Sequence, residues 1–80
     1  MTIGEAVRQR IMELCQERNL SFNKLSSISG VTQSTVNNIV SGRNNSTTVS
    51  TIKKLCDGLG ITVVAFFHSD LFMDLEQEIK

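Results

Sequence analysis

Six side chains that can both donate and accept hydrogen bonds lie between Thr32 and Gly42, among apolar residues at helical spacing. The pattern predicts an amphipathic helix from residue 33 to about residue 41. Its polar face carries amides and hydroxyls, and none of the carboxylate, thiol or imidazole groups that general acid–base catalysis and zinc binding use most. The side chains expected to point outward are those of Gln33, Ser34, Asn37 and Asn38, with Ser41 at the end of the helix.

The chain around this helix is free of acidic residues from Arg18 to Cys56. Residues 1–54 hold seven Lys/Arg and three Glu, a net +4, whereas residues 55–80 hold one Lys and five Asp/Glu, a net −4. Such an asymmetry favours contact between the first part and a polyanion, because basic groups release counterions from phosphates. A solvated surface that merely lacks acids is the alternative, and charge alone does not separate the two. The basic residues of the acid-free stretch are Arg18, Lys24, Arg43, Lys53 and Lys54.

Length and composition exclude several classes of protein. Eighty residues make one small domain with a thin core, which oligomerisation often supplements. The longest apolar stretch is far shorter than the ~20 residues of a membrane helix, and Glu5 interrupts any secretory signal. Two widely separated cysteines and a single histidine, His68, form no recognisable metal or catalytic set. We therefore expect a reduced cytoplasmic protein without enzyme activity, metal, cofactor or membrane contact.

The hydrophobic spacing predicts an all-α chain. Five helices are expected over residues 3–18, 22–29, 33–41, 49–59 and 63–68, and most of them follow a Ser or Thr that can cap the helix N-terminus. A strand is the rival for residues 63–68, but the chain offers no second strand to pair with it. The tail from residue 70 to residue 80 has apolar residues at helical spacing and is expected to form a short C-terminal helical extension. The expected inward residues are Val7, Ile11, Leu14, Cys15, Phe22, Leu25, Ile28, Val36, Ile39, Val40, Val49, Ile52, Leu55, Cys56 and Leu59.

Residues 21–43 resemble the helix-turn-helix of the Cro/CI-type (XRE) family, the lambda-repressor-like DNA-binding domains. The family pattern has a Ser/Thr cap, a helix with a central Leu and a small residue, a Gly-Val-Ser/Thr turn and a polar second helix that ends at Gly. Including the neighbouring helices, the resemblance covers about residues 3–67. It implies a five-helix DNA-binding domain over residues 1–69. The matching elements here are Ser21, Leu25 with Ser26, Gly30-Val31-Thr32, Val36 with Ile39, and Gly42.

The resemblance implies that the third helix enters the major groove of double-stranded DNA. Gln33, Ser34 and Asn38 would then contact base edges, with Asn37 at the rim of the same face. Amide side chains match the N6 and N7 atoms of adenine, so we expect A·T pairs to be prominent in the site. Phosphate contacts are expected at the periphery, although Phe22 replaces a polar residue that often binds phosphate in the family. The expected phosphate-contacting residues are Ser21, Asn23, Thr32, Thr35, Arg43, Asn44 and Asn45.

The C-terminal part carries more apolar residues than so small a core can bury. We expect residues 70–80 to contribute to a two-fold homodimer interface, so that two recognition helices meet an inverted repeat and the acidic tail lies away from the DNA. An ordinary packing role within the domain is the alternative for these residues. A second hypothesis for function is a protein-interaction module, antitoxin or controller protein whose apolar C-terminal surface binds a partner such as a toxin. The expected interface residues are Val64, Phe67, Leu71, Phe72, Leu75 and Ile79.

Overall fold

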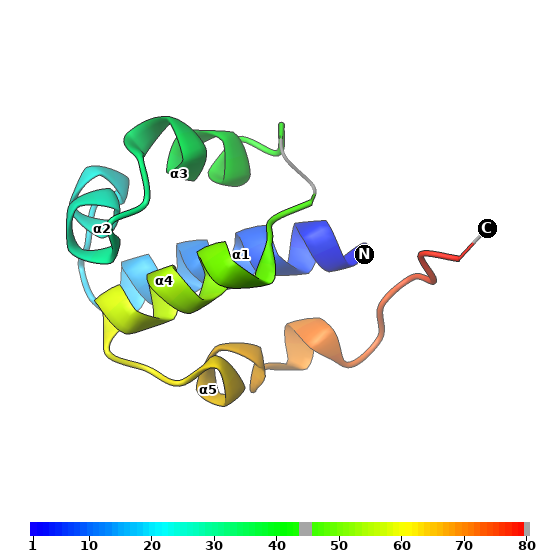
Figure 1. The fold of residues 1–80 in the computed structure, drawn as a ribbon. Coiled ribbons are helices and arrows are strands. Elements are labelled where there is room, and N and C mark those ends of the chain that lie inside the picture. The colour runs from blue at the N-terminus through cyan, green and yellow to red at the C-terminus, as the bar shows by residue number, and fades with distance from the viewer. Residues whose placement is uncertain (44–45, 80) are drawn as a thin grey trace.

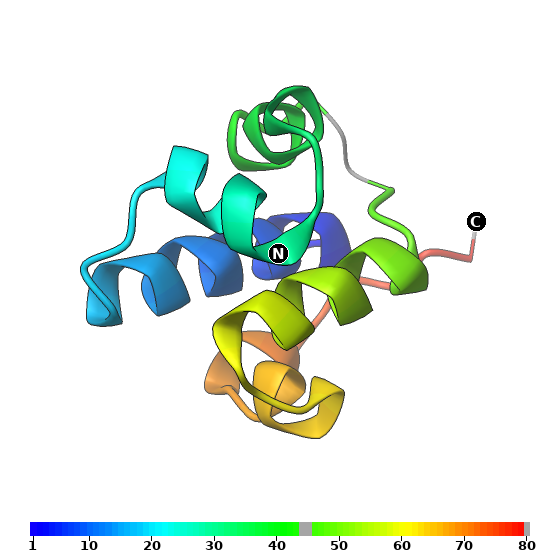
Figure 2. The same ribbon diagram turned by 60° about the vertical axis from the view of Figure 1, so that its left-hand side comes forward.

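The computed structural model describes residues 1–43 and 46–79, and all regular secondary structure in that part of the chain is helical. Helices α1 and α4 lie in the middle of the molecule, with α3 on one side of them and α5 on the other (Figures 1 and 2). The all-α, five-helix prediction is confirmed. The elements are α1 (Ile3–Glu17), α2 (Phe22–Ser29), α3 (Gln33–Val40), α4 (Val49–Leu59), α5 (Val63–Phe67) and a 3₁₀ helix, η1 (Asp70–Phe72).

Each α-helix begins after a hydroxyl side chain that accepts a hydrogen bond from a backbone N–H in the first turn. These bonds satisfy donors that the helix itself leaves free, which explains why the helix starts were predictable. Thr2 and Glu5 form the complete reciprocal capping box at the start of α1. The hydrogen bond from the backbone of Thr2 lowers the pKa of the Glu5 carboxyl group. The other caps are Ser21, Thr32, Thr48 and Thr62.

The core lies where the five α-helices meet, and most of the expected inward residues are there. The predicted stripe of α1 is buried along its whole length. Two predictions are wrong: Ile28 is 39% exposed and Val49 is 77% exposed. Phe22 and Val40 are half-buried at the edge of the core. The buried core residues are Ala6, Val7, Ile11, Leu14, Cys15, Leu25, Val31, Val36, Ile39, Ile52, Leu55, Cys56, Leu59 and Phe66.

Helices α2 and α4 approach each other closely at Gly58. A Cβ atom added to Gly58 would lie 2.8 Å from the Cα atom of Ser29 and 2.9 Å from its backbone nitrogen. No side chain fits at that distance without moving one of the two helices. From the sequence, this glycine reads only as a weak point in the last turn of α4. The structure shows that it sets the distance between α4 and the helix-turn-helix.

The short helix α5 is held against α1 by an arginine. The Nε atom of Arg10 donates to the carbonyl oxygen of Phe66 at 2.7 Å, and one terminal nitrogen donates to the carbonyl of Ala65 at 3.0 Å. Carbonyl groups at a helix C-terminus lack hydrogen-bond donors within the helix and carry partial negative charge. A guanidinium group supplies both N–H donors and a positive charge. Phe66 is fully buried beneath this contact. Residues 63–67 are therefore a docked helix and not a strand.

The predicted C-terminal helical extension is wrong beyond its first turn. Only η1 is helical after α5, and residues 73–79 form no regular helix. In an α-helix the backbone N–H of Glu76 would donate to the carbonyl of Phe72. It donates instead to the carbonyl oxygen of Met1, at 3.0 Å. The tail thus passes beside the N-terminal end of the chain and runs on without helical structure (Figure 1).

Candidate nucleic-acid interface

Helices α2 and α3 are joined by a tight turn. Gly30 ends α2 in the left-handed conformation, with φ of 72°, which residues other than glycine adopt at a cost. The hydroxyl of Ser26 then donates to the carbonyl oxygen of Val31 at 2.6 Å. This bond ties α2 to the residue just before the cap of α3, Thr32. The turn therefore fixes the angle between the helices, and α3 forms one side of the molecule (Figure 2).

Helix α3 is divided into a buried face and an exposed face, as predicted. Val36 and Ile39 are 1% and 2% exposed, so they hold the helix firmly against the body of the protein. The side chains of Gln33, Ser34 and Asn37 are exposed, whereas Asn38 is half-buried. The four residues predicted to contact bases thus lie on one short helix, and three of them are exposed.

Gln33, a predicted base-contacting residue, is bonded to Asn23, a predicted phosphate-contacting residue. Its Nε2 atom donates to the Oδ1 atom of Asn23, which lies on α2. The bond fixes which end of the Gln33 amide points outward for further contacts. No local pattern predicts this pair, because the two residues are ten positions apart on different helices.

Three of the predicted phosphate-contacting residues also serve as helix caps or support one. Ser21 accepts from the backbone of Lys24 at 3.1 Å, and Thr32 accepts from the backbone of Thr35 at 3.2 Å. The hydroxyls of Thr32 and Thr35 lie 2.8 Å apart. These residues therefore set the positions of helix N-termini, whose backbone N–H groups are suited to anions.

The loop that follows α3 contains the remaining predicted phosphate contacts. Arg43 is exposed at its start. Asn44 and Asn45 lie outside the described residues. Ser46 and Thr47 lead from this loop into α4.

The basic residues of the acid-free stretch are not equally available. Lys53 is paired with Asp57 one turn along α4, and this hydrogen bond raises the pKa of the Lys53 ammonium group. Asp57 lies one residue beyond the acid-free stretch, so the pairing escapes a count of charges within it. Lys24, Lys54 and Arg43 are exposed, and no ion pair joins them to an acidic residue within residues 1–43 and 46–79.

The predicted dimer residues fall into two groups. Phe67 and Phe72 pack edge to face with ring centroids 4.9 Å apart and belong with Phe66 to the domain's own aromatic cluster. Val64 and Ile79 are 79% and 88% exposed. Leu71 and Leu75 are half-buried. The residues thus serve partly as domain packing and partly as uncovered apolar surface, and the dimer itself stays a prediction.

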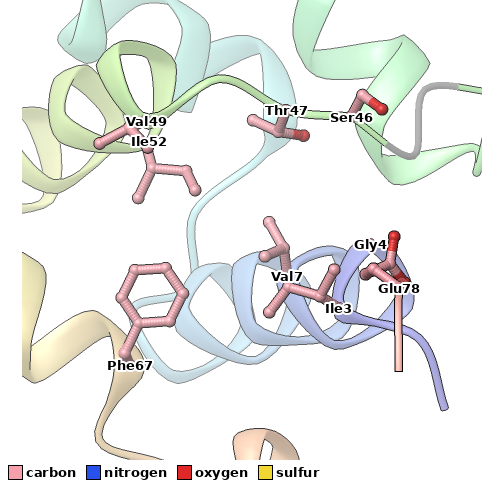
Figure 3. Close-up of a pocket in the computed structure, with 9 residues that line it drawn as sticks. All are labelled: Ile3, Gly4, Val7, Ser46, Thr47, Val49, Ile52, Phe67 and Glu78. Atoms are coloured by element: carbon pink, nitrogen blue, oxygen red, sulfur yellow. The ribbon is translucent and has the colours of Figure 1, made fainter. Parts of the chain in front are cut away.

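An apolar pocket of about 300 Å³ opens between α1, α4 and α5. Figure 3 shows Phe67 at one end of it and Ser46, Gly4 and Glu78 toward the other. The exposed Val49 is one of its lining residues. The remaining lining residues are Ile3, Val7, Thr47 and Ile52.

The groups that metal binding or thiol chemistry would use are scattered or buried among the described residues. No group of three or more His, Cys, Asp or Glu side chains is placed to hold a metal ion within residues 1–43 and 46–79. Cys15 and Cys56 are both free and buried, and burial raises the pKa of each thiol. No helix in this part of the chain is long and apolar enough to cross a membrane.

Comparison with known proteins agrees with this geometry. Residues 10–64 match the family model described as the Cro/C1-type HTH DNA-binding domain. A solved structure described as the crystal structure of the prophage Lp1 protein 11 is 41% identical in sequence, with a TM-score of 0.78 over 88% of this chain and 92% of that one. No curated protein matches the chain. The family model spans the helix-turn-helix and the helices that support it, and the chain therefore belongs to the Cro/C1-type family of helix-turn-helix DNA-binding domains.

Proposed function

We propose that the protein is a transcriptional regulator, most simply a repressor, that binds a short inverted repeat in double-stranded DNA as a homodimer. The observation that carries the proposal is the exposed amide and hydroxyl face of α3, held outward by the buried Val36 and Ile39. Asn is a poor helix former, so Asn37 and Asn38 on adjacent positions cost helix stability that a purely structural surface would avoid.

In this proposal Gln33, Ser34 and Asn38 read base edges in the major groove, with Asn37 at the rim. Asn23 holds the Gln33 amide in one orientation, which lowers the entropy lost when that amide binds. No arginine lies on the face, and arginine is the usual partner of guanine. The preferred site is therefore expected to be rich in A·T pairs.

Phosphate contacts come from the margins of this face. Arg43 follows α3 in the sequence. Its guanidinium group forms no ion pair with an acidic residue among the described residues. Asn44 and Asn45 follow it in the sequence. Ser21, Asn23, Thr32 and Thr35 lie at the starts of α2 and α3, where backbone N–H groups favour an anion.

A homodimer fits the arrangement of the faces. Helices α3 and α5 lie on opposite sides of the α1–α4 layer, so a contact made through the α5 side leaves α3 free for DNA (Figure 1). The apolar surface offered there includes the exposed Val64 and the half-buried Leu71. The half-buried Leu75 and the exposed Ile79 follow in the tail. Two copies would present their recognition helices about 34 Å apart, one turn of DNA. Sedimentation of a monomer at tens of micromolar would contradict this part of the proposal.

A protein-interaction role, as an antitoxin or controller protein, is the second candidate. The observation that favours it is the open apolar pocket beside Val49 and Phe67, which a partner's side chain would fill. In that case the affinity for any DNA sequence is expected to stay at the non-specific level, ~10⁻⁴–10⁻⁶ M at physiological salt.

Variants on the two classes of contact test the proposal. Gln33→Ala and Asn38→Ala are each expected to cost about 1–3 kcal/mol of binding free energy on the preferred duplex and little on random duplexes. Arg43→Ala is expected to weaken binding to all duplexes alike and to reduce the salt slope by about one. Gln16→Ala, which removes an exposed amide on α1, is the matched control. Unchanged specific binding by Asn38→Ala would show that the base readers are wrongly assigned.

A further inference from the structure

The acidic C-terminal tail does not lie wholly away from the predicted DNA-contacting side. From η1 it rises past the start of α1 to the level of the α1–α4 layer (Figures 1 and 2). Glu78 lines the same pocket as Ser46 and Thr47, the residues that connect the α3–α4 loop to α4 (Figure 3). Glu78 thus lies beside the residues that lead from the α3–α4 loop into α4, and not with the rest of the acidic tail near η1.

The tail is fixed in this course by contacts upstream of Glu78. The backbone N–H of Glu76 donates to the carbonyl of Met1 at 3.0 Å, and Leu75 is half-buried. The ring of Phe72 packs against Phe67. Glu78 follows only two residues after Glu76, so its backbone is held beside the start of α1.

The charge of Glu78 is uncompensated in the described chain. Other acidic residues have partners: Glu13 pairs with Arg10, Asp57 with Lys53 and Glu76 with the amino group of Met1. No ion pair or hydrogen bond to the Glu78 carboxylate occurs within residues 1–43 and 46–79, and its side chain is exposed. A negative charge there acts on whatever binds the neighbouring loop.

The loop beside Glu78 is the one proposed to hold the DNA backbone. Arg43 and Ser46 are three residues apart, so their Cα atoms are separated by at most about 11 Å. Ser46 in turn lines the same pocket as Glu78. Exposed charges interact over a distance of about 10 Å at 0.1 M salt. Glu78 would repel a phosphate bound at the loop and would also compete with that phosphate for Arg43.

We propose that the acidic tail is a built-in electrostatic brake on DNA binding, with Glu78 as its principal residue. The inference rests on the proposed function, because it presumes that the α3–α4 loop faces the phosphates. The brake acts on the sequence-independent part of the affinity. It therefore raises the share of binding energy that must come from correct base contacts.

The test compares two variants that remove one negative charge each from the same tail. Glu78→Gln is the test variant. Asp74→Asn is the matched control, because Asp74 lies with Met1, Glu13 and Asp70 and not beside the loop. Affinities of the full-length variants for a random-sequence duplex and for the preferred duplex are measured by fluorescence anisotropy between low and physiological salt.

The brake predicts that Glu78→Gln binds both duplexes about two- to fivefold more tightly at low salt, the scale of an exposed charge interaction, with a gain that shrinks as salt is added. Asp74→Asn should give a clearly smaller gain. Equal affinities for Glu78→Gln and wild type, or equal gains in the two variants, would overturn the inference. A wild-type protein that prefers no DNA sequence would instead contradict the proposed function, whatever the variants do.

Discussion

At the scale of single residues, the bond between Gln33 and Asn23 is the feature with the most direct consequence for binding. It joins a proposed base contact on α3 to a proposed backbone contact on α2, so neither side chain acts independently. A Gln33 amide without this partner is free to rotate and to present either its oxygen or its nitrogen to a base.

A double-mutant cycle measures this dependence. Asn23→Ala and Gln33→Ala are expected to show a coupling of ~0.5–3 kcal/mol in the free energy of binding to the preferred duplex, because the first variant removes part of what the second residue contributes. Ser27→Ala, also exposed on α2, should show no coupling with Gln33→Ala. Strictly additive losses from Asn23→Ala and Gln33→Ala would mean that the bond does not organise the interface.

The exposed face of α3 could be predicted better than the edges of the core. Gln33, Ser34 and Asn37 are exposed because Val36 and Ile39 fix the rotation of α3, and both sets are visible in the sequence. Ile28 was assigned wrongly inward because a spacing of three residues turns by 300°, so successive apolar residues drift around α2. Leu25 takes the centre of the buried face, and Ile28 is left at its edge.

At the scale of elements, the close approach of α4 to α2 depends on Gly58. Gly58→Ala should gain some helix propensity but lose about 1–3 kcal/mol of unfolding free energy overall, because the new methyl group meets the backbone of Ser29. Urea unfolding followed by circular dichroism measures the difference. Ser50→Ala, exposed in the same helix, is the control for propensity. A Gly58→Ala protein as stable as wild type would show that the two helices separate at little cost.

The docking of α5 depends on Arg10. Arg10→Ala is expected to lose ~1.5–3 kcal/mol of stability, since two backbone carbonyls lose a charged donor and the side chain is only 14% exposed. Arg10→Lys should recover part of the loss, because a lysine keeps the charge but not the two-pronged geometry. Thermal unfolding of both variants, beside Arg18→Ala as an exposed control, gives the comparison. Equal melting temperatures for Arg10→Ala and wild type would contradict this role.

The elements themselves were predictable where a cap and a buried stripe coincide. Thr2, Ser21, Thr32, Thr48 and Thr62 each mark a helix start, and the glycines at 30 and 60 mark ends. The tail has apolar residues at helical spacing, but a short helix with few packing contacts is marginal in water. The backbone N–H of Glu76 donates to the carbonyl oxygen of Met1 instead. Local sequence patterns do not reveal such a tertiary contact.

At the scale of the whole molecule, the two sides of the α1–α4 layer have different roles in the proposed function. The polar helix α3 is followed by the exposed Arg43, whereas α5, with the exposed Val64, is followed by the acidic Asp70 and Asp74. The charge asymmetry of the sequence foretold this division in part. It did not foretell that the end of the tail returns toward the α3–α4 loop, because that course depends on how η1 and Met1 hold the chain.

The central claim is that two copies of this chain read one inverted repeat through α3. Selection of binding sites from random duplex DNA at about physiological salt tests it most directly. The account predicts enrichment of an A·T-rich inverted repeat whose half-sites are centred about one helical turn, ~10 base pairs, apart. Enrichment of a single unrepeated half-site would contradict the dimer, and no enrichment at all would contradict sequence-specific binding.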